Sequence, residues 1–356
     1  MNNNIEHILV IRFRQIGDAV LAVALCSTLK RTFPAAKIDL VLNKSIAPLL
    51  KGHPDIDRVI TFDPKENSHF CTYVGKVHRV MTQTRYDVII DMRSTFRTLL
   101  FSLLSLHTPF RIGRKKGYNR WLQNYRIDYY NPSLHMDMVQ RNRMLAEPLQ
   151  VLTPIVNVPE FRLFVTEEEK AAFRAYMVGE GIDFRKPVVL VSVTAKLDHK
   201  RWPVQRMTEV IRRMIDTFAP QVIFNYAPGK EEEEAFLVYG ALKEDPHVFI
   251  DLQAHSLRAL ATLCSMTTFF FGNEGGPRHI AHSMGVPSYV IFSPEINKEQ
   301  WLPVNEVPAV GICTKDLCSP EEMKSLSYQE QYDRITVEDV WRELDPMLNR
   351  YLPRRD

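Results

Sequence analysis

The chain between Thr267 and Pro287 reads TTFFFGNEGGPRHIAHSMGVP, and this stretch decides the fold. Its aromatic run, which ends at Gly272, predicts a buried strand of a parallel sheet. The segment 278–284 predicts a helix that stops at Gly285. A buried strand, a tight turn and a helix in succession are the repeating unit of a doubly wound α/β sheet.

The turn inside this stretch, Asn273 to Pro277, contains Gly275 and Gly276 side by side. Adjacent glycines let backbone N–H groups approach an anion closely. The first turn of the following helix adds unpaired donors and the positive end of the helix dipole. His279 stands in that first turn and adds a ring nitrogen. The turn therefore predicts a phosphate site, with an ordinary strand-to-helix connection as the alternative.

The composition is that of a globular protein large enough for two domains, with 356 residues, 45% hydrophobic and 24% charged. A net charge of +3 argues against a protein that binds nucleic acid over a broad surface. No apolar run reaches the roughly 18–20 residues of a membrane span, and the N-terminus lacks the basic and apolar regions of a signal peptide. Five scattered cysteines are typical of a reducing compartment, so we expect a cytoplasmic protein.

Strand-like and helix-like segments alternate along the whole chain. We predict strands at 7–13, 37–42, 55–62, 86–91, 187–193, 221–226, 248–252, 267–272 and 288–292. We predict helices at 19–33, 66–85, 135–149, 204–218, 256–266, 278–284 and 336–351, and a further helix beginning after Thr166. The stretch Val151–Phe164 has two prolines and no helical period, which indicates an extended linker. The pattern predicts two doubly wound α/β domains, one on each side of this linker.

Gly17-Asp18 follows the first predicted strand, at the edge of the sheet where ligands bind in doubly wound folds. Asp18 has two interpretations at this position. It is either the N-cap of the following helix or a carboxylate that takes a proton from an acceptor hydroxyl. Spacing alone favours the cap.

A second group of polar residues, which includes Arg93 and Arg97, follows the strand at 86–91 and lies at the carboxyl edge of the sheet. The stretch Arg111–Arg126 then holds six Arg or Lys residues interleaved with three aromatic residues. Such a stretch binds nucleic acid or an anionic saccharide, or forms a solvated basic loop with packed aromatics. The small net charge makes nucleic acid the weakest of these interpretations.

Two loops of the second half carry charged residues at predicted strand ends. Lys200-Arg-Trp-Pro203 follows the strand at 187–193, and its cations are typical of a phosphate site, although Trp-Pro is also a common helix start. Lys230-Glu-Glu-Glu-Glu234 follows the strand at 221–226. Acids in a first helical turn stabilise the helix dipole, and in nucleotide-binding folds one such acid accepts the hydroxyls of a ribose.

Cys313 and Cys318 lie on either side of Asp316 in the C-terminal part of the chain. A zinc site would need two more suitable ligands nearby. We therefore interpret the pair as structural or incidental and predict no metal site.

Several of these motifs together resemble the glycosyltransferase family 9 enzymes, the bacterial lipopolysaccharide heptosyltransferases. The matching segments, in family order, are Ile8–Asp18, Ile90–Arg93, Lys200–Pro203, Ala227–Gly229 with the acids that follow, Gly272–Ala281 and the Cys313/Cys318 tail. The likeness extends from about Ile8 to Trp341. Each motif is short, and it is their common order and spacing that make the resemblance specific.

The resemblance implies a GT-B fold, in which two Rossmann-like domains face one another across a cleft. It implies an acceptor-binding domain at 1–160, a nucleotide-sugar-binding domain at 161–335 and a C-terminal helix at 336–356 that returns to the first domain. The implied activity is inverting transfer of a heptose or related sugar from a nucleotide diphosphate, ADP-heptose in the family, to a lipopolysaccharide core acceptor. It implies no metal and no cofactor, because the nucleotide sugar is a substrate. A lipid-linked acceptor also implies peripheral contact with the cytoplasmic face of the inner membrane.

The resemblance also assigns roles to residues. Asp18 becomes the general base, which overturns the preference for a helix cap, and Lys200 becomes the cation on the leaving diphosphate. The implied donor site comprises Gly17, Glu232 (or Glu231 if the alignment shifts by one), Glu274, Gly275, Gly276, Pro277 and His279. The implied acceptor site comprises Arg93, Arg97, Arg114 and Arg120, within or near the Arg111–Arg126 stretch.

Four positions depart from the family pattern. Glu274-Gly275 stands where the family has Asp followed by Ser or Thr, so a hydroxyl is missing beside the carboxylate. Arg278 replaces the usual Met or Leu, and we expect it to add a cation near the phosphates; Ala24 replaces a common Pro. A pocket rebuilt in this way admits a different donor sugar. It also motivates the alternative that the chain is a non-catalytic GT-B protein that binds a sugar nucleotide or a glycan.

Overall fold

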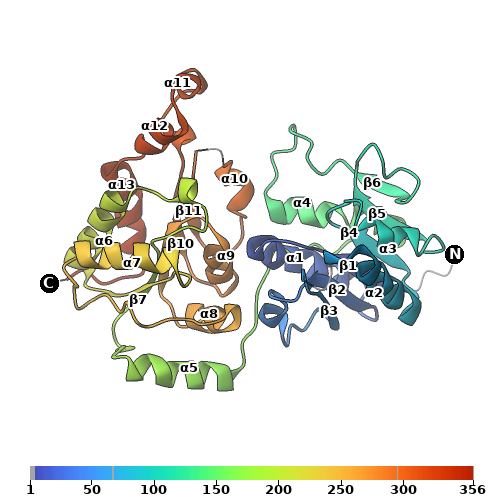
Figure 1. Ribbon diagram of the computed structural model, residues 1–356, viewed down its shortest axis with the longest axis horizontal. Helices are drawn as coiled ribbons and strands as arrows, with labels where there is room; N and C mark the ends of the chain where they lie inside the picture. The colour runs from blue at the N-terminus through green and yellow to red at the C-terminus, as the bar shows by residue number, and fades with distance from the viewer. Residues whose placement is uncertain (1–4, 66–67, 295, 356) are drawn as a thin grey trace. The chain divides into compact units, whose positions relative to one another are not determined.

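The computed structural model describes residues 5–65, 68–294 and 296–355. The chain divides into two compact units, Met1–Phe164 and Val165–Asp356. Each unit contains one parallel sheet and its own helices (Figure 1). The division falls at the end of the predicted linker, close to the domain boundary expected after residue 160.

The first unit has a sheet of six parallel strands in the order β3-β2-β1-β4-β5-β6. Its strands are β1 (His7–Ile11), β2 (Lys37–Asn43), β3 (Arg58–Phe62), β4 (Val88–Asp91), β5 (Phe110–Arg114) and β6 (Tyr125–Ile127). Strand order reverses between β1 and β4, which pair directly. In a doubly wound sheet, the carboxyl ends of the two strands at such a reversal form the usual ligand-binding edge.

The strands β5 and β6 lie within the basic stretch, where we predicted no strand. Arginine side chains obscure the apolar pattern there. The side chain of Arg111 is satisfied by backbone carbonyls, with Nε donating to Leu122 at 2.8 Å and Nη1 to Leu106 at 2.8 Å. Because Arg111 lies on β5 and donates to loop carbonyls, an arginine occupies a strand position. The sequence therefore shows no clear alternation of apolar and polar residues there.

The helices of the first unit are α1 (Ile16–Thr32), η1 (Ala47–Leu50), α2 (Phe70–Gln83), α3 (Leu99–Leu103), α4 (Met138–Met144) and η3 (Glu147–Val151). We predicted α2 from residue 66, and its first two predicted residues lie outside the described ones. The helix α1 starts earlier than predicted, with Gln15 at the N-cap position. Asp18 is therefore the third residue of the helix, and the expectation that it caps α1 is wrong.

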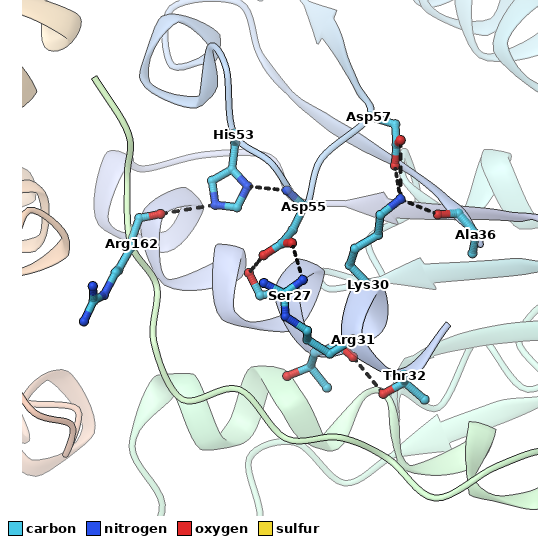
Figure 2. A network of polar contacts seen from close by, with 10 residues as sticks. Ser27, Lys30, Arg31, Thr32, Ala36, His53, Asp55, Asp57 and Arg162 are labelled. Atoms are coloured by element: carbon cyan, nitrogen blue, oxygen red, sulfur yellow. Dashed lines mark hydrogen bonds and ion pairs between the residues drawn. The ribbon is translucent and has the colours of Figure 1, made fainter. Parts of the chain in front are cut away.

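The extended linker is bound to α1 through side-chain hydroxyls. Thr32 Oγ1 accepts from the Val156 N–H at 3.0 Å, and Thr28 Oγ1 accepts from the Val158 N–H at 3.1 Å. Further along, the buried ring of His53 accepts from the Asp55 N–H through Nδ1 at 3.1 Å, and its Nε2 donates to the Arg162 carbonyl at 3.2 Å (Figure 2). The linker thus belongs structurally to the first unit up to its last residues.

The second unit has a sheet of five parallel strands in the order β11-β10-β9-β7-β8. Its strands are β7 (Val188–Ser192), β8 (Gln221–Phe224), β9 (Phe269–Asn273), β10 (Ser288–Ile291) and β11 (Ala309–Ile312). The reversal of strand order falls between β7 and β9, which pair directly. The stretch that decided the fold thus supplies one of the two strands at the ligand-binding edge.

The prediction of a strand at 248–252 is wrong. Only a single bridge, between Val222 and Val248, joins this segment to the sheet. The side-chain amide of Gln253 donates to the Phe224 carbonyl at 3.0 Å and to the Ile250 carbonyl at 2.9 Å. A side chain thus occupies backbone acceptors that a longer strand would have used.

The helices of the second unit are α5 (Glu167–Gly179), η4 (Asp198–Lys200), α6 (Val204–Phe218), α7 (Lys230–Ala241), α8 (Leu257–Cys264), α9 (Gly276–Ser283), α10 (Lys298–Trp301), η5 (Thr314–Asp316), α11 (Pro320–Ser325), α12 (Tyr328–Asp333) and α13 (Val337–Leu348). The predicted helix start at Thr166 is confirmed, because Thr166 and Glu169 form a capping box. None of the described helices is long and apolar enough to span a bilayer.

The C-terminal helix α13 belongs to the second unit, whereas we expected it to return to the first domain. It packs against α6 (Figure 1) and buries Val340, Leu344 and Leu348 in the core of the second unit. Just before the helix, the Ile335 carbonyl accepts from Trp202 Nε1 at 3.1 Å. An apolar helix face and a buried indole donor that needs an acceptor fix α13 in this place.

Candidate functional site

The predicted site residues lie at the carboxyl ends of the strands where each sheet reverses order. In the first unit, Asp18 follows β1 and Arg93 follows β4. In the second unit, Lys200 follows β7 and the glycine turn follows β9. Each unit therefore presents its candidate side chains at the edge where doubly wound folds bind ligands.

Asp18 is held at this edge by the buried guanidinium of Arg12. The two side chains form an ion pair, and Arg12 Nη1 also lies 3.4 Å from the Met92 carbonyl, which follows β4. The Asp18 side chain is 18% exposed and that of Arg12 5%. The carboxylate is thus fixed in position but still reached by solvent.

A buried carboxylate, Asp91 at the end of β4, builds the turn that carries Arg93. Its Oδ1 accepts from the Arg93 N–H at 2.9 Å and from the Ser94 N–H at 2.8 Å. Burial raises the pKa of Asp91, and these hydrogen bonds act against that rise. Ser94 adopts a left-handed conformation, with φ of 50°, and its hydroxyl donates to Gln123 Oε1 at 2.9 Å. The Asp91 motif is therefore a structural support for the loop after β4.

Arg93 lies near three other arginines and near Asp18. Burial lowers the pKa of Arg93, and the nearby charges of Arg14, Arg12 and Arg114 lower it further, while Asp18 opposes them. Four guanidinium groups beside two carboxylates, Asp18 and the buried Asp91, leave an excess of positive charge, which favours an anionic ligand. We predicted Arg93 and Arg114 but missed Arg12 and Arg14. Their signal was present in the sequence, as two cations directly after a buried strand.

Arg114 is the best placed of these arginines to bind an anion. It is buried, its Nη1 donates to Tyr130 Oη at 2.6 Å, and its guanidinium stacks on the Tyr129 ring at 4.0 Å from the centroid. Its Nε and Nη2 have no hydrogen-bond partner among the described residues. Buried donors left in this state are costly unless a ligand or water accepts from them.

The other two predicted acceptor residues lie on aromatic surfaces. The Arg97 guanidinium is 5.7 Å from the centroid of the Tyr73 ring, and that of Arg120 is 4.4 Å from the centroid of the Trp121 ring. Both side chains are exposed. The structure therefore brings Arg93 and Arg114 together near Asp18, and gives Arg97 and Arg120 aromatic partners instead.

In the second unit, the side chain of Asn273 joins the ends of β9 and β7. Its Nδ2 donates to the carbonyls of Ser192 at 3.2 Å and Val193 at 3.0 Å. Its Oδ1 accepts from the Trp202 N–H at 2.9 Å. The loop that carries Lys200 is thereby attached to the glycine turn.

Lys200 and Glu274 form an ion pair beside the glycine turn, with Nζ and Oε1 3.2 Å apart. The same carboxylate oxygen accepts from the Ser293 hydroxyl, which follows β10, at 2.6 Å. Lys200 keeps 30% of its side chain exposed. Its neighbour Arg201 is paired with Glu234 and does not act as the second cation that the sequence suggested.

The helix α9 begins directly at the glycine turn. Gly275 is its N-cap, in an extended conformation, and Gly276 and Pro277 are its first two residues. Proline at this place removes one N–H that has no partner within the helix, while the other N–H groups of the first turn remain as donors. His279 is the fourth residue of α9 and is buried, and its Nδ1 has no partner among the described residues.

The structure separates the two candidate acids of α7. Glu231 Oε2 accepts from Thr194 Oγ1 at 2.8 Å, and Thr194 follows β7 at the ligand-binding edge. Glu232 is exposed and accepts from the Gly229 N–H at 3.2 Å, which completes the capping box of its own helix. Glu231, the alternative that the alignment left open, is therefore the better placed of the two.

Arg278 supplies a cation near the glycine turn, where its charge interacts with that of Glu274, but its guanidinium bonds inside the protein and is not free to bind a phosphate. It is buried, and it donates to the Trp301 carbonyl of α10. Its Nη1 lies 3.3 Å from Nδ1 of His282. Burial lowers the pKa of Arg278 to about 9, so the group keeps its charge at neutral pH.

The five cysteines are all free. Burial raises the pKa of Cys313, which is thus a weakly reactive thiol. Among the described residues there is no group of three or more His, Cys, Asp or Glu side chains placed to hold a metal ion.

Two doubly wound sheets, each with its candidate residues at the point of strand reversal, are the architecture of the GT-B fold. The comparisons with known proteins agree. A solved structure of a family 9 glycosyltransferase from Veillonella parvula superimposes with a TM-score of 0.81 at 18% identity, covering 97% of this chain and 98% of that one. The structure of the Escherichia coli ADP-heptose lipopolysaccharide heptosyltransferase II superimposes with a TM-score of 0.73 at 22% identity, covering 97% and 99%.

At the level of sequence, the chain is 23% identical over 300 residues to lipopolysaccharide heptosyltransferase 2 of Salmonella typhimurium, covering 81% of this chain and 82% of that protein. The family model of glycosyltransferase family 9 (heptosyltransferase) matches residues 74–331. The chain therefore belongs to glycosyltransferase family 9. The predicted family and GT-B fold are confirmed, and the protein is a glycosyltransferase.

Buried His282 leads us to expect that the second unit loses stability in mild acid. Burial, and then the charge of Arg278, lowers the pKa of His282 from 6.5 to about 4. The unfolded chain binds this proton near pH 6.5 and the folded protein only near pH 4. The free energy of unfolding should therefore fall as the pH is lowered through this range, by up to about 1.4 kcal/mol per pH unit.

Chemical denaturation at pH 7 and pH 5 measures this loss. The variant H282Q keeps an amide donor for the Oδ1 of Asn305, which lies 2.8 Å from His282 Nε2, but has no proton to gain. It should lose less stability between the two pH values than the wild type. The same loss in both proteins would show that His282 is not the group responsible.

Proposed function

We propose that the protein is an inverting glycosyltransferase that transfers a heptose from ADP-heptose to a lipopolysaccharide core acceptor at the cytoplasmic face of the inner membrane. The observation that carries the proposal is Asp18, held by Arg12 at the ligand-binding edge of the first sheet among four arginines. The printed names of relatives support the substrates: one is an ADP-heptose lipopolysaccharide heptosyltransferase, and another E. coli heptosyltransferase was solved with ADP-2-deoxy-2-fluoro heptose.

In this proposal the first unit binds the acceptor. Asp18 takes the proton of the acceptor hydroxyl, whose oxygen forms a bond to the anomeric carbon of the sugar. The bond from that carbon to the diphosphate oxygen breaks on the opposite side, so the configuration inverts and the electron pair leaves with the diphosphate. Arg93 and Arg114 hold phosphate or carboxylate groups of the acceptor, because guanidinium groups bind such anions with paired hydrogen bonds.

The second unit binds the donor. The negative charge that develops on the diphosphate is stabilised by Lys200, by the N–H groups of the first turn of α9 and by His279. Glu274 holds Lys200 at this place. Glu231 binds the ribose hydroxyls, in preference to Glu232, which caps its own helix. These groups belong to the chain itself, so the proposed reaction needs no metal and no cofactor.

Replacement of Asp18 by Asn tests the catalytic half of the proposal. The amide cannot take the proton, so kcat should fall by about 10²–10⁴-fold, while the affinity for ADP, measured by calorimetry, should stay nearly unchanged. The matched control is E6Q, which makes the same chemical change at an exposed residue before β1, at the other edge of the sheet. Thermal denaturation verifies that D18N stays folded without its ion pair to Arg12. Full turnover by D18N would end the proposal of a general base.

Replacement of Arg114 by Met tests the acceptor half. Loss of a buried charged donor should raise the KM for the acceptor by about 10–100-fold and leave the KM for the donor unchanged. R120M is the control, since it removes an exposed cation of the same stretch that lies on Trp121. An acceptor KM that changes more in R120M than in R114M would place the acceptor on the outer surface instead.

An exposed aromatic surface in the first unit supports the proposed membrane contact. It consists of Phe96, Tyr118 and Trp121, of which Phe96 and Trp121 are 75% and 76% exposed, and the rings of Phe96 and Tyr118 stack at 4.4 Å. Arg120 supplies positive charge beside the Trp121 ring. Aromatic and basic side chains together bind the interface of an anionic bilayer.

Co-sedimentation with vesicles of anionic phospholipid tests this contact. W121A should bind the vesicles several-fold more weakly than the wild type, because the indole buries the largest apolar area of the aromatic surface. L237A, which removes a 66% exposed apolar side chain from the second unit, should bind as the wild type does. Equal binding by W121A and the wild type would exclude the aromatic surface from membrane contact.

A further inference from the structure

Arg278 forms a buried polar chain with two histidines of α9. Its Nη1 lies 3.3 Å from His282 Nδ1, and its Nη2 lies 3.4 Å from His279 Nε2. Nη2 also donates to the Trp301 carbonyl. All three of the side chains from α9 are at most 6% exposed. The chain is therefore shielded from water, and its hydrogen bonds decide where the ring protons lie.

The chemistry of the guanidinium determines the state of both rings. A guanidinium only donates hydrogen bonds, so each ring nitrogen that faces Arg278 must accept. A neutral imidazole accepts at one nitrogen and carries its proton on the other. His279 therefore accepts at Nε2 and carries its proton on Nδ1. His282 accepts at Nδ1 and carries its proton on Nε2, where Asn305 Oδ1 lies 2.8 Å away to receive it.

The two ends of this chain differ. At His282 the ring N–H has an acceptor within the protein, the amide oxygen of Asn305. At His279 the buried Nδ1 has no partner among the described residues. The Nδ1–H group is thus a buried donor, and the described part of the chain supplies no acceptor for it. His279 stands in the first turn of α9, where backbone N–H groups also lack partners.

We propose that Arg278 is a positioning residue that fixes His279 as the Nδ1–H tautomer, so that an uncharged ring offers a hydrogen-bond donor to the diphosphate of the nucleotide sugar. The placement of the diphosphate rests on the proposed function, whereas the tautomer does not. The cation that distinguishes this chain from the family pattern thus acts through a histidine and does not touch the substrate.

Burial supports this role for Arg278. Desolvation, and then the charge of Arg278, holds the pKa of His279 well below its usual range. The ring is therefore neutral at the pH of the cytoplasm, and only its tautomer remains to be decided. The packing of the ring edge-on to Trp301, with centroids 5.7 Å apart, limits its rotation. An apolar side chain at position 278 would leave Nε2 without a donor and either tautomer open.

Two-bond ¹⁵N–¹H NMR spectra of the full-length protein labelled with ¹⁵N-histidine test the tautomer directly. The chain has eleven histidines, and the variants H279Q and H282Q assign the two signals by their loss. The wild type should show His279 protonated at Nδ1 and His282 protonated at Nε2. In R278M, His279 should change to Nε2–H or to a mixture, while His282 stays as it is because Asn305 still fixes it. R278K, which keeps a buried cationic donor, should retain the wild-type tautomer of His279.

Calorimetry with ADP as the probe gives the functional readout. R278M should bind ADP about tenfold more weakly than the wild type, and R278K should recover most of the affinity. Exchange of a buried charge for a Met of similar length is commonly tolerated by the fold, which thermal denaturation verifies. Should R278M fail to fold, the wild-type and R278K spectra still decide the tautomer.

Two results would overturn the inference. His279 protonated at Nε2 in the wild type, or an unchanged Nδ1–H tautomer in R278M, would show that Arg278 does not fix the ring. A tautomer that changes in R278M without any loss of ADP affinity would remove His279 from the donor site. Wild-type protein that does not bind ADP at all would overturn the proposed donor instead, and the NMR result would remain valid on its own.

Discussion

The side-chain amide of Asn273 is the constraint on which the second unit's site depends. It donates to the carbonyls at the end of β7 and accepts from the Trp202 backbone, so one buried group joins both strands at the reversal and the loop of Lys200. A buried amide must satisfy both its donor and its acceptor. The preceding residue, Gly272, makes the approach possible, because a Cβ there would lie 2.4 Å from the Ser192 carbonyl oxygen.

Much of the fold could be predicted because the central strands are parallel and buried on both faces. Such strands appear in the sequence as short apolar runs, and the runs at β1, β4, β7 and β9 contain no charged residue before their last positions. The candidate sites followed from the same signal. Polar residues directly after an apolar run must lie at the carboxyl edge of the sheet, whatever their partners are.

What could not be predicted depended on partners distant in the sequence. The strands β5 and β6 are stabilised by bonds from Arg111 to connecting loops, and no local period marks them. The difference in position between Glu231 and Glu232 depends on Thr194, which lies at the end of a different strand. The place of α13 required the buried indole of Trp202 as a donor to Ile335. Amphipathic patterns identify that a helix face is buried, but not against which element.

The direction of Arg278 could not be predicted for a further reason. A cation next to a predicted phosphate turn is expected to face the anion, since Coulomb attraction is strong at short range. In the folded chain, the guanidinium instead finds a carbonyl and two imidazole acceptors within the protein. These neutral acceptors satisfy its N–H groups, and the charge of Glu274 nearby favours its ionised form.

The two candidate sites differ in how their charges are balanced, and this difference agrees with binding different anions. At the first site four guanidinium groups lie near two carboxylates, Asp18 and the buried Asp91, so an anionic ligand meets an excess of positive charge. At the second site Lys200 is already paired with Glu274. A ligand there has to share this lysine with a carboxylate of the protein, and its remaining stabilisation must come from the N–H groups of the glycine turn and of α9. Donors of this kind are fixed in space, so they stabilise a group that gains negative charge during a reaction. Because they carry no net charge, they do not bind that group so tightly that it cannot leave.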